Sequence, residues 1–211
     1  MVVEPGPGKA TAVGIAGILL AAGKGRRFDP DGIKNKLLQP LPGGEPVVAA
    51  AAKSLHSVVP RVLAIIRPGA EDVADCLRRL GVDITECASA DEGMAASLTH
   101  GLALVSDADG WIISLGDMPY VQPTTIAALV DALARGADIA VPVCRERRGH
   151  PVAFSRHHLP RLLALTGDMG ARDLLREYPV VEVATDDPGI HDDIDTVADI
   201  THRHGGRQIS G

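Results

Sequence analysis

Apolar stretches of strand length recur along the chain and contain very few charged residues. Such nearly continuous apolar runs are typical of strands that are buried on both faces of a parallel sheet. The clearest runs are GIAGILLA (14–21), RVLAIIR (61–67) and WIISLG (111–116), and shorter strands are expected at VDIT (82–85), DIAVPV (138–143), PVAF (151–154) and VVEVA (180–184). The chain therefore carries the strands of one large sheet.

Segments with the periodicity of amphipathic helices separate these strands. In the segment 70–81, Val73, Leu77 and Leu80 fall on one helical face, and Gly81 provides a C-terminal stop. Helices are expected at 45–58, with Pro46 in its first turn, at 70–81, 93–105 and 123–136, and within 162–178. The alternation of strands and helices predicts an α/β fold, with helices on both faces of a mostly parallel sheet.

Length and composition indicate one globular domain with an aliphatic core. We assign residues 13–205 to this domain and residues 1–12 to a flexible N-terminal tail. Only 2% of the residues are aromatic, which excludes the stacking platforms of proteins that bind single-stranded nucleic acid. The formal net charge of -6 argues against a nucleic-acid or anionic-membrane surface, so an anionic ligand needs a local cluster of cations.

Cysteine usage and the N-terminal segment point to the cytoplasm. Cys76, Cys87 and Cys144 are widely spaced and form no CxxC pair, so neither a disulfide framework nor a zinc site is indicated. The first residues lack the basic start and apolar core of a signal peptide, and no apolar run is long enough to span a bilayer. We therefore expect a cytoplasmic protein without a membrane anchor.

The first strand ends in AAGKGRRF (21–28), a loop of glycines and cations. Ligands bind at the carboxyl ends of the strands in parallel sheets, and glycines there let backbone amides approach a phosphate. The P-loop pattern is absent, and the dinucleotide fingerprint fails because Phe28 stands at its last glycine. The loop therefore favours phosphate binding, with a solvated glycine-rich turn as the alternative.

Several acidic residues and one histidine follow other predicted strands. Asp117 comes directly after WIISLG, where a carboxylate that faces a phosphate loop is suited to anchor magnesium, although a turn or N-cap role also fits. His150 could contact a ligand or the backbone. Asp168 and Asp195 could each hold metal or cap a helix.

Taken together and in this order, the motifs resemble those of the molybdenum cofactor nucleotidyltransferases. The resemblance covers about residues 14–200 and is carried by LLAAGKGRRF, NKLL, EGMAASL, LGDMP, RGHPVAF, GDMGAR and DIDT. It implies a Rossmann-like three-layer sandwich of the nucleotidyltransferase, or GT-A-like, type. The chain departs from the family pattern at Phe28 and Asp29, where the family usually has Met-Gly, and Asp31 adds a further acidic residue nearby.

The resemblance also implies the reaction and its residues. CMP would pass from CTP to a phosphorylated acceptor, molybdopterin carrying molybdenum, with release of pyrophosphate and Mg²⁺ as cofactor. The AAG form of the loop resembles the cytidylyltransferase branch, and a molybdoenzyme or its chaperone is the expected partner. The implied catalytic residues are Lys36, Arg27 and Asp117, and the implied metal ligands are Asp117 and Asp195. The implied nucleotide-binding residues are Leu20, Ala21, Ala22, Gly23, Lys24, Gly25, Arg27, Lys36, Gly93 and Ser97, and the implied acceptor-binding residues are His150 and Asp168.

Three other functions remain as alternatives. The same nucleotidyl transfer could use a sugar phosphate as acceptor, or could move a guanylyl group to molybdopterin. A nucleotide-binding accessory protein without turnover would not need both Lys36 and Asp117. An NAD-dependent oxidoreductase is disfavoured because Arg67-Pro68-Gly69, and no ribose-binding acid, follows the second strand.

Overall fold

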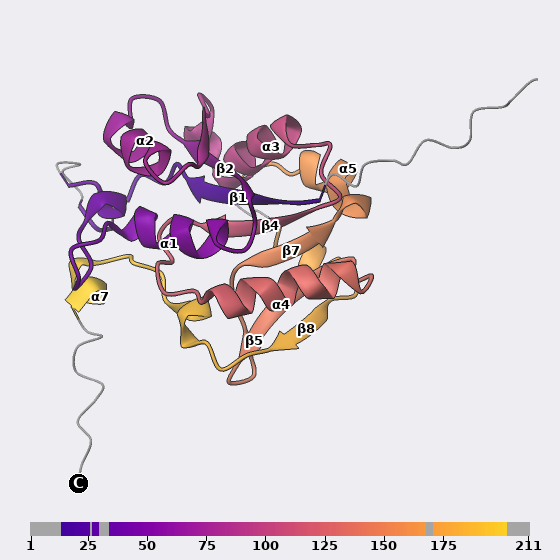
Figure 1. Cartoon of the computed structure of the whole chain (residues 1–211). Coiled ribbons are helices and arrows are strands. Elements are labelled where there is room, and N and C mark those ends of the chain that lie inside the picture. The colour runs from indigo at the N-terminus through magenta and orange to yellow at the C-terminus, as the bar shows by residue number, and fades with distance from the viewer. Residues whose placement is uncertain (1–13, 26, 30–33, 168–170, 202–211) are drawn as a thin grey trace, which may run out of the picture.

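The structure is a computed structural model that describes residues 14–25, 27–29, 34–167 and 171–201. The tail predicted at residues 1–12 lies outside the described residues, as does Asp168. In the described part of the chain, helices and strands alternate around one central sheet, as the hydrophobic pattern predicts (Figure 1).

The sheet has eight strands, and its order is β3-β2-β1-β4-β7-β5-β6, with β8 pairing to β5. The pairs β1–β2, β1–β4, β2–β3 and β5–β8 are parallel, whereas β7 and β6 pair antiparallel with their neighbours. The strands are β1 (Ile15–Ala21), β2 (Arg61–Ile66), β3 (Asp83–Glu86), β4 (Gly110–Leu115), β5 (Ile139–Cys144), β6 (Arg147–Arg148), β7 (Val152–Ser155) and β8 (Val181–Ala184). The predicted mostly parallel sheet is confirmed.

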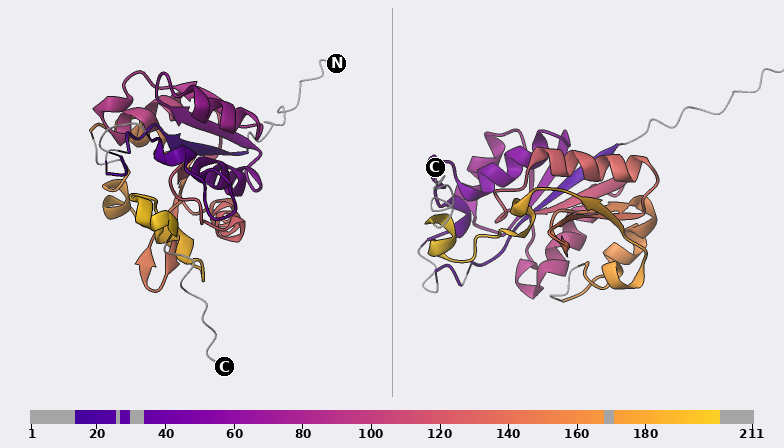
Figure 2. Two further views of the ribbon diagram at one scale, coloured as in Figure 1. Left: turned by 90° about the vertical axis from the view of Figure 1, so that its left-hand side faces the viewer. Right: turned by 90° about the horizontal axis from the view of Figure 1, so that it is seen from below.

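Helices cover both faces of this sheet, so the molecule has three layers (Figure 2). Neighbouring residues of β1 point to opposite faces: Leu19 packs with α1, α2 and α4, and Ile18 packs with α3, α5 and α6. The α-helices are α1 (Val47–His56), α2 (Glu71–Arg78), α3 (Met94–Leu104), α4 (Pro123–Ala134), α5 (Leu159–Leu163), α6 (Leu174–Glu177) and α7 (Val197–Thr201). Short 3-10 helices are η1 (Lys36–Leu38), η2 (Ala90–Glu92), η3 (Arg156–His158) and η4 (Pro188–His191).

Element boundaries differ from the predicted ones mainly near the C-terminus. The helix predicted within 162–178 is the short α6, while α5 begins earlier, at Leu159. Gly167 has φ +70°, a left-handed backbone conformation that ends helical structure, and it lies between these two helices. Among the described residues, no helix is both long enough and apolar enough to cross a membrane.

The topology brings the residues after β1 and β4 to one edge of the sheet. Both strands are parallel, so their carboxyl ends lie side by side, at the end of the molecule where α7 also lies (Figure 1). The predicted site residues after these strands that the structure describes, Gly23 to Gly25, Arg27 and Asp117, therefore meet there.

Candidate active site

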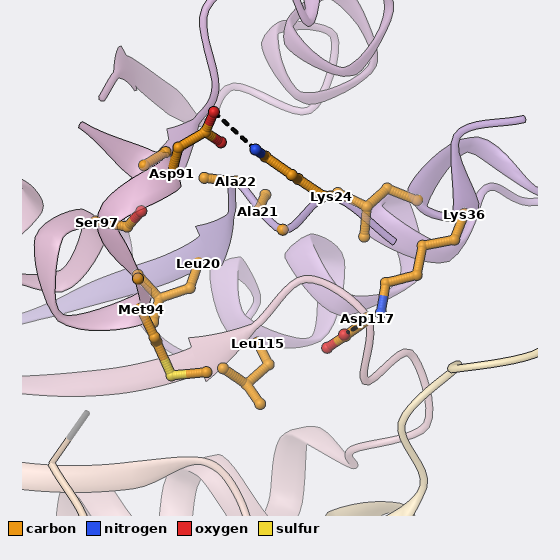
Figure 3. Close-up of a pocket in the computed structure, with 14 residues that line it drawn as sticks. Leu20, Ala21, Ala22, Lys24, Lys36, Asp91, Met94, Ser97, Leu115 and Asp117 are labelled. Atoms are coloured by element: carbon orange, nitrogen blue, oxygen red, sulfur yellow. Dashed lines mark hydrogen bonds and ion pairs between the residues drawn. The ribbon is translucent and has the colours of Figure 1, made fainter. Parts of the chain in front are cut away.

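A cavity of about 550 Å³ opens at the carboxyl ends of β1 and β4. Its wall includes nine of the residues predicted from the sequence: Leu20, Ala21, Ala22, Gly23, Lys24, Lys36, Gly93, Ser97 and Asp117. The apolar side chains of Leu20 and Met94 lie near Ser97 at one end, and Lys36 meets Asp117 at the other (Figure 3). The cavity therefore has the Lys36–Asp117 ion pair at one end, and apolar side chains beside the Lys24–Asp91 ion pair at the other.

The loop after β1 turns sharply at Gly25. This glycine has φ +60°, and its carbonyl oxygen accepts hydrogen bonds from the backbone N–H groups of Phe28, at 2.9 Å, and Asp29, at 3.1 Å. A Cβ atom at Gly25 would lie 3.3 Å from Lys36 Cγ, so the glycine also lets the lysine side chain pass close to the loop. The turn thus places the loop backbone beside Lys36.

Lys36 lies between two carboxylates from distant parts of the sequence. Its Nζ is 2.6 Å from Asp117 Oδ2 and 3.4 Å from Asp195 Oδ1. Lys36 is only 9% exposed, and the side chain of Asn35 begins its 3-10 helix by accepting a hydrogen bond from Leu37 N. The backbone N–H of Ile194 donates to the Asp117 carbonyl at 2.9 Å, which brings Asp195 next to Asp117. The two predicted metal ligands therefore converge on one cation.

Gly25 and Arg27 line a smaller neighbouring cavity of about 230 Å³ and are absent from the wall of the main one. Arg27 pairs with Asp195 Oδ2, and its side chain is 82% exposed. Asp29 accepts a hydrogen bond from the backbone N–H of Lys34, while Asp31 lies outside the described residues. Arg27 thus reaches the charged end of the site from its outer side.

His150 is largely withdrawn from solvent and close to the acidic end of the site. Burial lowers its pKa below the ordinary value of 6.5, the charge of Asp117 opposes this shift, and Arg172 adds to it. Its backbone N–H donates to Ile190 O at 3.0 Å, and within the described part of the chain its Nδ1 has no hydrogen-bond partner. The imidazole is therefore neutral near pH 7 and available for hydrogen bonding.

The sequence reasoning missed Asp91, which lines the main cavity. Its carboxylate pairs with Lys24 Nζ at 2.8 Å and with Arg67 at 2.7 Å (Figure 3). The ion pair draws Lys24 toward η2, on the far side of the cavity from Lys36. The position of Asp91, two residues before Gly93 of the recognised EGMAASL motif, was the available signal.

Comparison with known sequences finds similarity over most of the chain. The family model of the MobA-like NTP transferase domain matches residues 17–183, a span that contains the residues of the main cavity and ends before Asp195. The purine catabolism protein PucB of Bacillus subtilis is 31% identical over 195 residues, which cover 86% of this chain and 92% of PucB. The bifunctional protein GlmU of Rhodospirillum rubrum is 33% identical over 143 residues, or 67% of this chain. The chain spans only 31% of the length of that GlmU.

Solved structures share the fold. The crystal structure of Rv0371c from Mycobacterium tuberculosis H37Rv matches with a TM-score of 0.78 and 30% identity, covering 90% of this chain and 96% of that one. A complex of Rv0371c with manganese matches with a TM-score of 0.71 and 29% identity, covering 88% and 95% of the two chains. The three-layer architecture therefore belongs to a known type of protein.

Proposed function

Since the chain belongs to the MobA-like NTP transferase family and is a nucleotidyltransferase, we propose that it moves CMP from CTP to molybdenum-loaded molybdopterin and releases pyrophosphate. The observation that carries the proposal is the cavity after β1 and β4, which is lined by the apolar side chains of Leu20 and Met94 at one end and by the Lys36–Asp117 ion pair at the other. A nucleoside triphosphate has the same division between an apolar base and a charged tail.

The site residues act by positioning and by neutralising charge. An oxygen of the acceptor phosphate forms a bond to the α-phosphorus of CTP, while the bond from that phosphorus to the bridging oxygen breaks and pyrophosphate takes the electron pair. Because this reaction brings several anions together, fixed cations and amides stabilise it, and no covalent nucleophile is required. In the proposal, Lys36 neutralises the triphosphate, and the loop amides from Ala21 to Gly25 bind its oxygens.

Asp117 and Asp195 fit a divalent cation. Each directs a carboxylate oxygen at the same Lys36 Nζ, and Mg²⁺ is held by one or two carboxylates together with substrate phosphates. Among the residues that the structure describes, no group of three or more His, Cys, Asp and Glu could hold a metal, so the triphosphate is needed to complete the proposed site. When bound, Mg²⁺ would supply positive charge to the phosphates. The manganese complex of the related Rv0371c supports a divalent metal.

The choice of cytosine rests on the AAG form of the loop. Ala22 is buried, and Leu20 and Ser97 lie at the end of the cavity away from Lys36 (Figure 3). We assign the base to this end and the triphosphate to the other. His150, near Asp117, is assigned to the acceptor side, and the free thiols of the three cysteines fit a cytoplasmic enzyme that passes its product to a molybdoenzyme or its chaperone.

The test is pyrophosphate release with each of the four nucleoside triphosphates, Mg²⁺ and a panel of phosphorylated acceptors. The proposal expects release with CTP and molybdenum-loaded molybdopterin. Release with a sugar phosphate, or with GTP, would keep the nucleotidyl transfer and overturn the acceptor or the donor. CTP binding without Mg²⁺-dependent release would instead indicate an accessory protein that carries nucleotide.

A matched pair of lysine variants ties the activity to this cavity. Lys36→Ala removes the ammonium group that pairs with Asp117, whereas Lys34→Ala removes an exposed lysine two residues earlier. We expect turnover to fall on the order of 10²-fold in the first variant and to stay near wild type in the second. Equal activity in the two variants would place the reaction outside this cavity.

A further inference from the structure

Phe28, at the departure from the family pattern, is a core residue. Only 7% of it is exposed, and it forms a small cluster with the buried side chains of Val47 and Ile194. Leu41, Tyr120 and Ile200 pack around this cluster. It is separate from the two large cores on the faces of the sheet. Phe28 therefore joins the loop after β1 to a segment more than 160 residues later.

Each of the two joined segments carries a charged site residue directly beside its apolar anchor. Arg27 precedes Phe28, Asp195 follows Ile194, and these two charged residues pair with each other. On the other side, Asp195 Oδ1 lies 3.4 Å from Lys36 Nζ. Packing of Phe28 on Ile194 thus brings together the residues that surround the smaller cavity, which Lys24, Gly25, Arg27, Phe28, Lys36 and Asp195 line.

The charged contacts alone are poorly suited to hold Asp195 in place. The Arg27 side chain is 82% exposed, and exposed ion pairs contribute little because water and salt screen them. The contact from Asp195 to Lys36 is at the long end of the hydrogen-bond range. By contrast, the side chains of Phe28, Val47 and Ile194 are buried and exclude solvent from their contacts. The neighbouring hydrogen bond from Ile194 N to Asp117 O holds the same segment at the end of β4.

We propose that Phe28 is a positioning residue whose packing against Ile194 holds Asp195 beside Asp117, where the two carboxylates take up a divalent cation with the triphosphate. This inference rests on the proposed nucleotidyl transfer and adds to it a residue that acts through the position of Asp195. Phe28, which with Asp29 stands in place of the family's Met-Gly sequence, then supplies the apolar surface that orders Asp195.

The first test compares three variants in the dependence of turnover on Mg²⁺. Phe28→Ala removes the anchor, Phe28→Leu keeps apolar volume, and Leu162→Ala truncates a fully buried residue in the core on the other face. We expect Phe28→Ala to raise the Mg²⁺ concentration for half-maximal rate by about 10- to 100-fold, as loss of an outer support of a metal ligand does. The rate at saturating Mg²⁺ should recover, and Phe28→Leu and Leu162→Ala should stay near wild type. The proposal is overturned if Phe28→Ala and Leu162→Ala require the same Mg²⁺ concentration for half-maximal rate.

The second test requires no turnover. Hydrogen exchange of the Ile194 amide, which donates to the Asp117 carbonyl, reports whether this segment stays docked on Asp117. Exchange there should be faster in Phe28→Ala than in wild type, and unchanged in Leu162→Ala. Unchanged exchange in Phe28→Ala refutes the positioning role even if the enzyme is active. Absence of pyrophosphate release from the wild-type protein refutes the proposed function instead, so the two failures are distinguishable.

Discussion

Near the carboxyl edge of the sheet, the side chain of Asp187 has different bonding partners from those of Asp117 and Asp195. Asp187 is 2% exposed, its Oδ2 accepts hydrogen bonds from Gln122 N and Thr125 Oγ1 at 2.8 Å, and its Oδ1 accepts from Gly189 N at 2.9 Å. The side chains of Asp117 and Asp195 are 23% and 30% exposed, and they face the cation of Lys36. The carboxylate of Asp187 is enclosed by hydrogen-bond donors, whereas those of Asp117 and Asp195 share the ammonium group of Lys36.

Under the proposed function, this difference separates a structural carboxylate from the two that would bind the metal. The donors to Asp187 include two backbone N–H groups that cannot move away without unfolding the turn. The ammonium group of Lys36 ends a long side chain, and it can turn toward a phosphate when another cation approaches the two carboxylates. Partial exposure and an exchangeable cationic partner therefore mark the site, and the acidic residue type alone does not.

The largest expected effect is on turnover, in Asp117→Asn. This substitution keeps the shape of the side chain and removes its charge, so we expect kcat/KM for pyrophosphate release to fall on the order of 10²-fold or more. Asp131→Asn, an exposed position on α4, is the control and should behave as wild type. Wild-type rates in Asp117→Asn would remove this residue from the mechanism and break the contrast with Asp187.

A stability effect of similar free energy is expected in Asp187→Ala. The substitution leaves Gln122 N, Thr125 Oγ1 and Gly189 N without their acceptor in a buried turn, so we expect the free energy of unfolding to fall by about 3 kcal/mol or more. Urea unfolding measures this loss. Pyrophosphate release per folded molecule should change little, because the cluster of Phe28, Val47 and Ile194 and the Ile194–Asp117 hydrogen bond both remain to place Asp195.

Thr125→Val provides a milder version of the same test. It deletes one of the three donors to Asp187 and keeps the side-chain shape of a β-branched residue. Its unfolding free energy should lie between those of wild type and Asp187→Ala. A large loss of activity with unchanged stability in either variant would show that Asp187 acts in the active site and is not a purely structural carboxylate.

The sequence predicted the parts of the site that lie next to strand ends. Leu20 and Ala21 end an apolar run that is evident from the pattern alone, Ala22 to Lys24 follow it, and Asp117 follows another such run. Because parallel strands end at one edge, the cavity between these two segments was predictable before any side chain was placed. The family resemblance supplied Lys36, which no local pattern identifies.

Long-range side-chain partners were beyond the sequence pattern. Nothing in the local sequence shows that Lys24 turns to Asp91, or that Phe28 packs on Ile194, because such contacts depend on the final folded arrangement of distant segments. The helix within 162–178 was predicted from its composition and is cut short, since Gly167 takes a left-handed conformation there. The candidate site could be located from the sequence, but the side-chain contacts between its distant segments could not be predicted.

The smallest expected effect is on kcat/KM, in Arg27→Ala. The salt dependence of this effect compares the exposed contact of Asp195 with Arg27 to its buried contact with Lys36. Arg27 binds Asp195 from the exposed side, whereas Lys36 binds it from the buried side, so loss of Arg27 should lower kcat/KM by only about 3- to 10-fold at low salt. Since the Debye length is about 8 Å at 0.15 M salt, this deficit should shrink as salt is added. Arg61→Ala, which breaks a similarly exposed pair with Asp107 far from the cavity, should change neither rate nor salt dependence. A deficit in Arg27→Ala that persists at high salt would mean that Arg27 contacts the triphosphate directly, and that its pairing with Asp195 belongs only to the ligand-free protein.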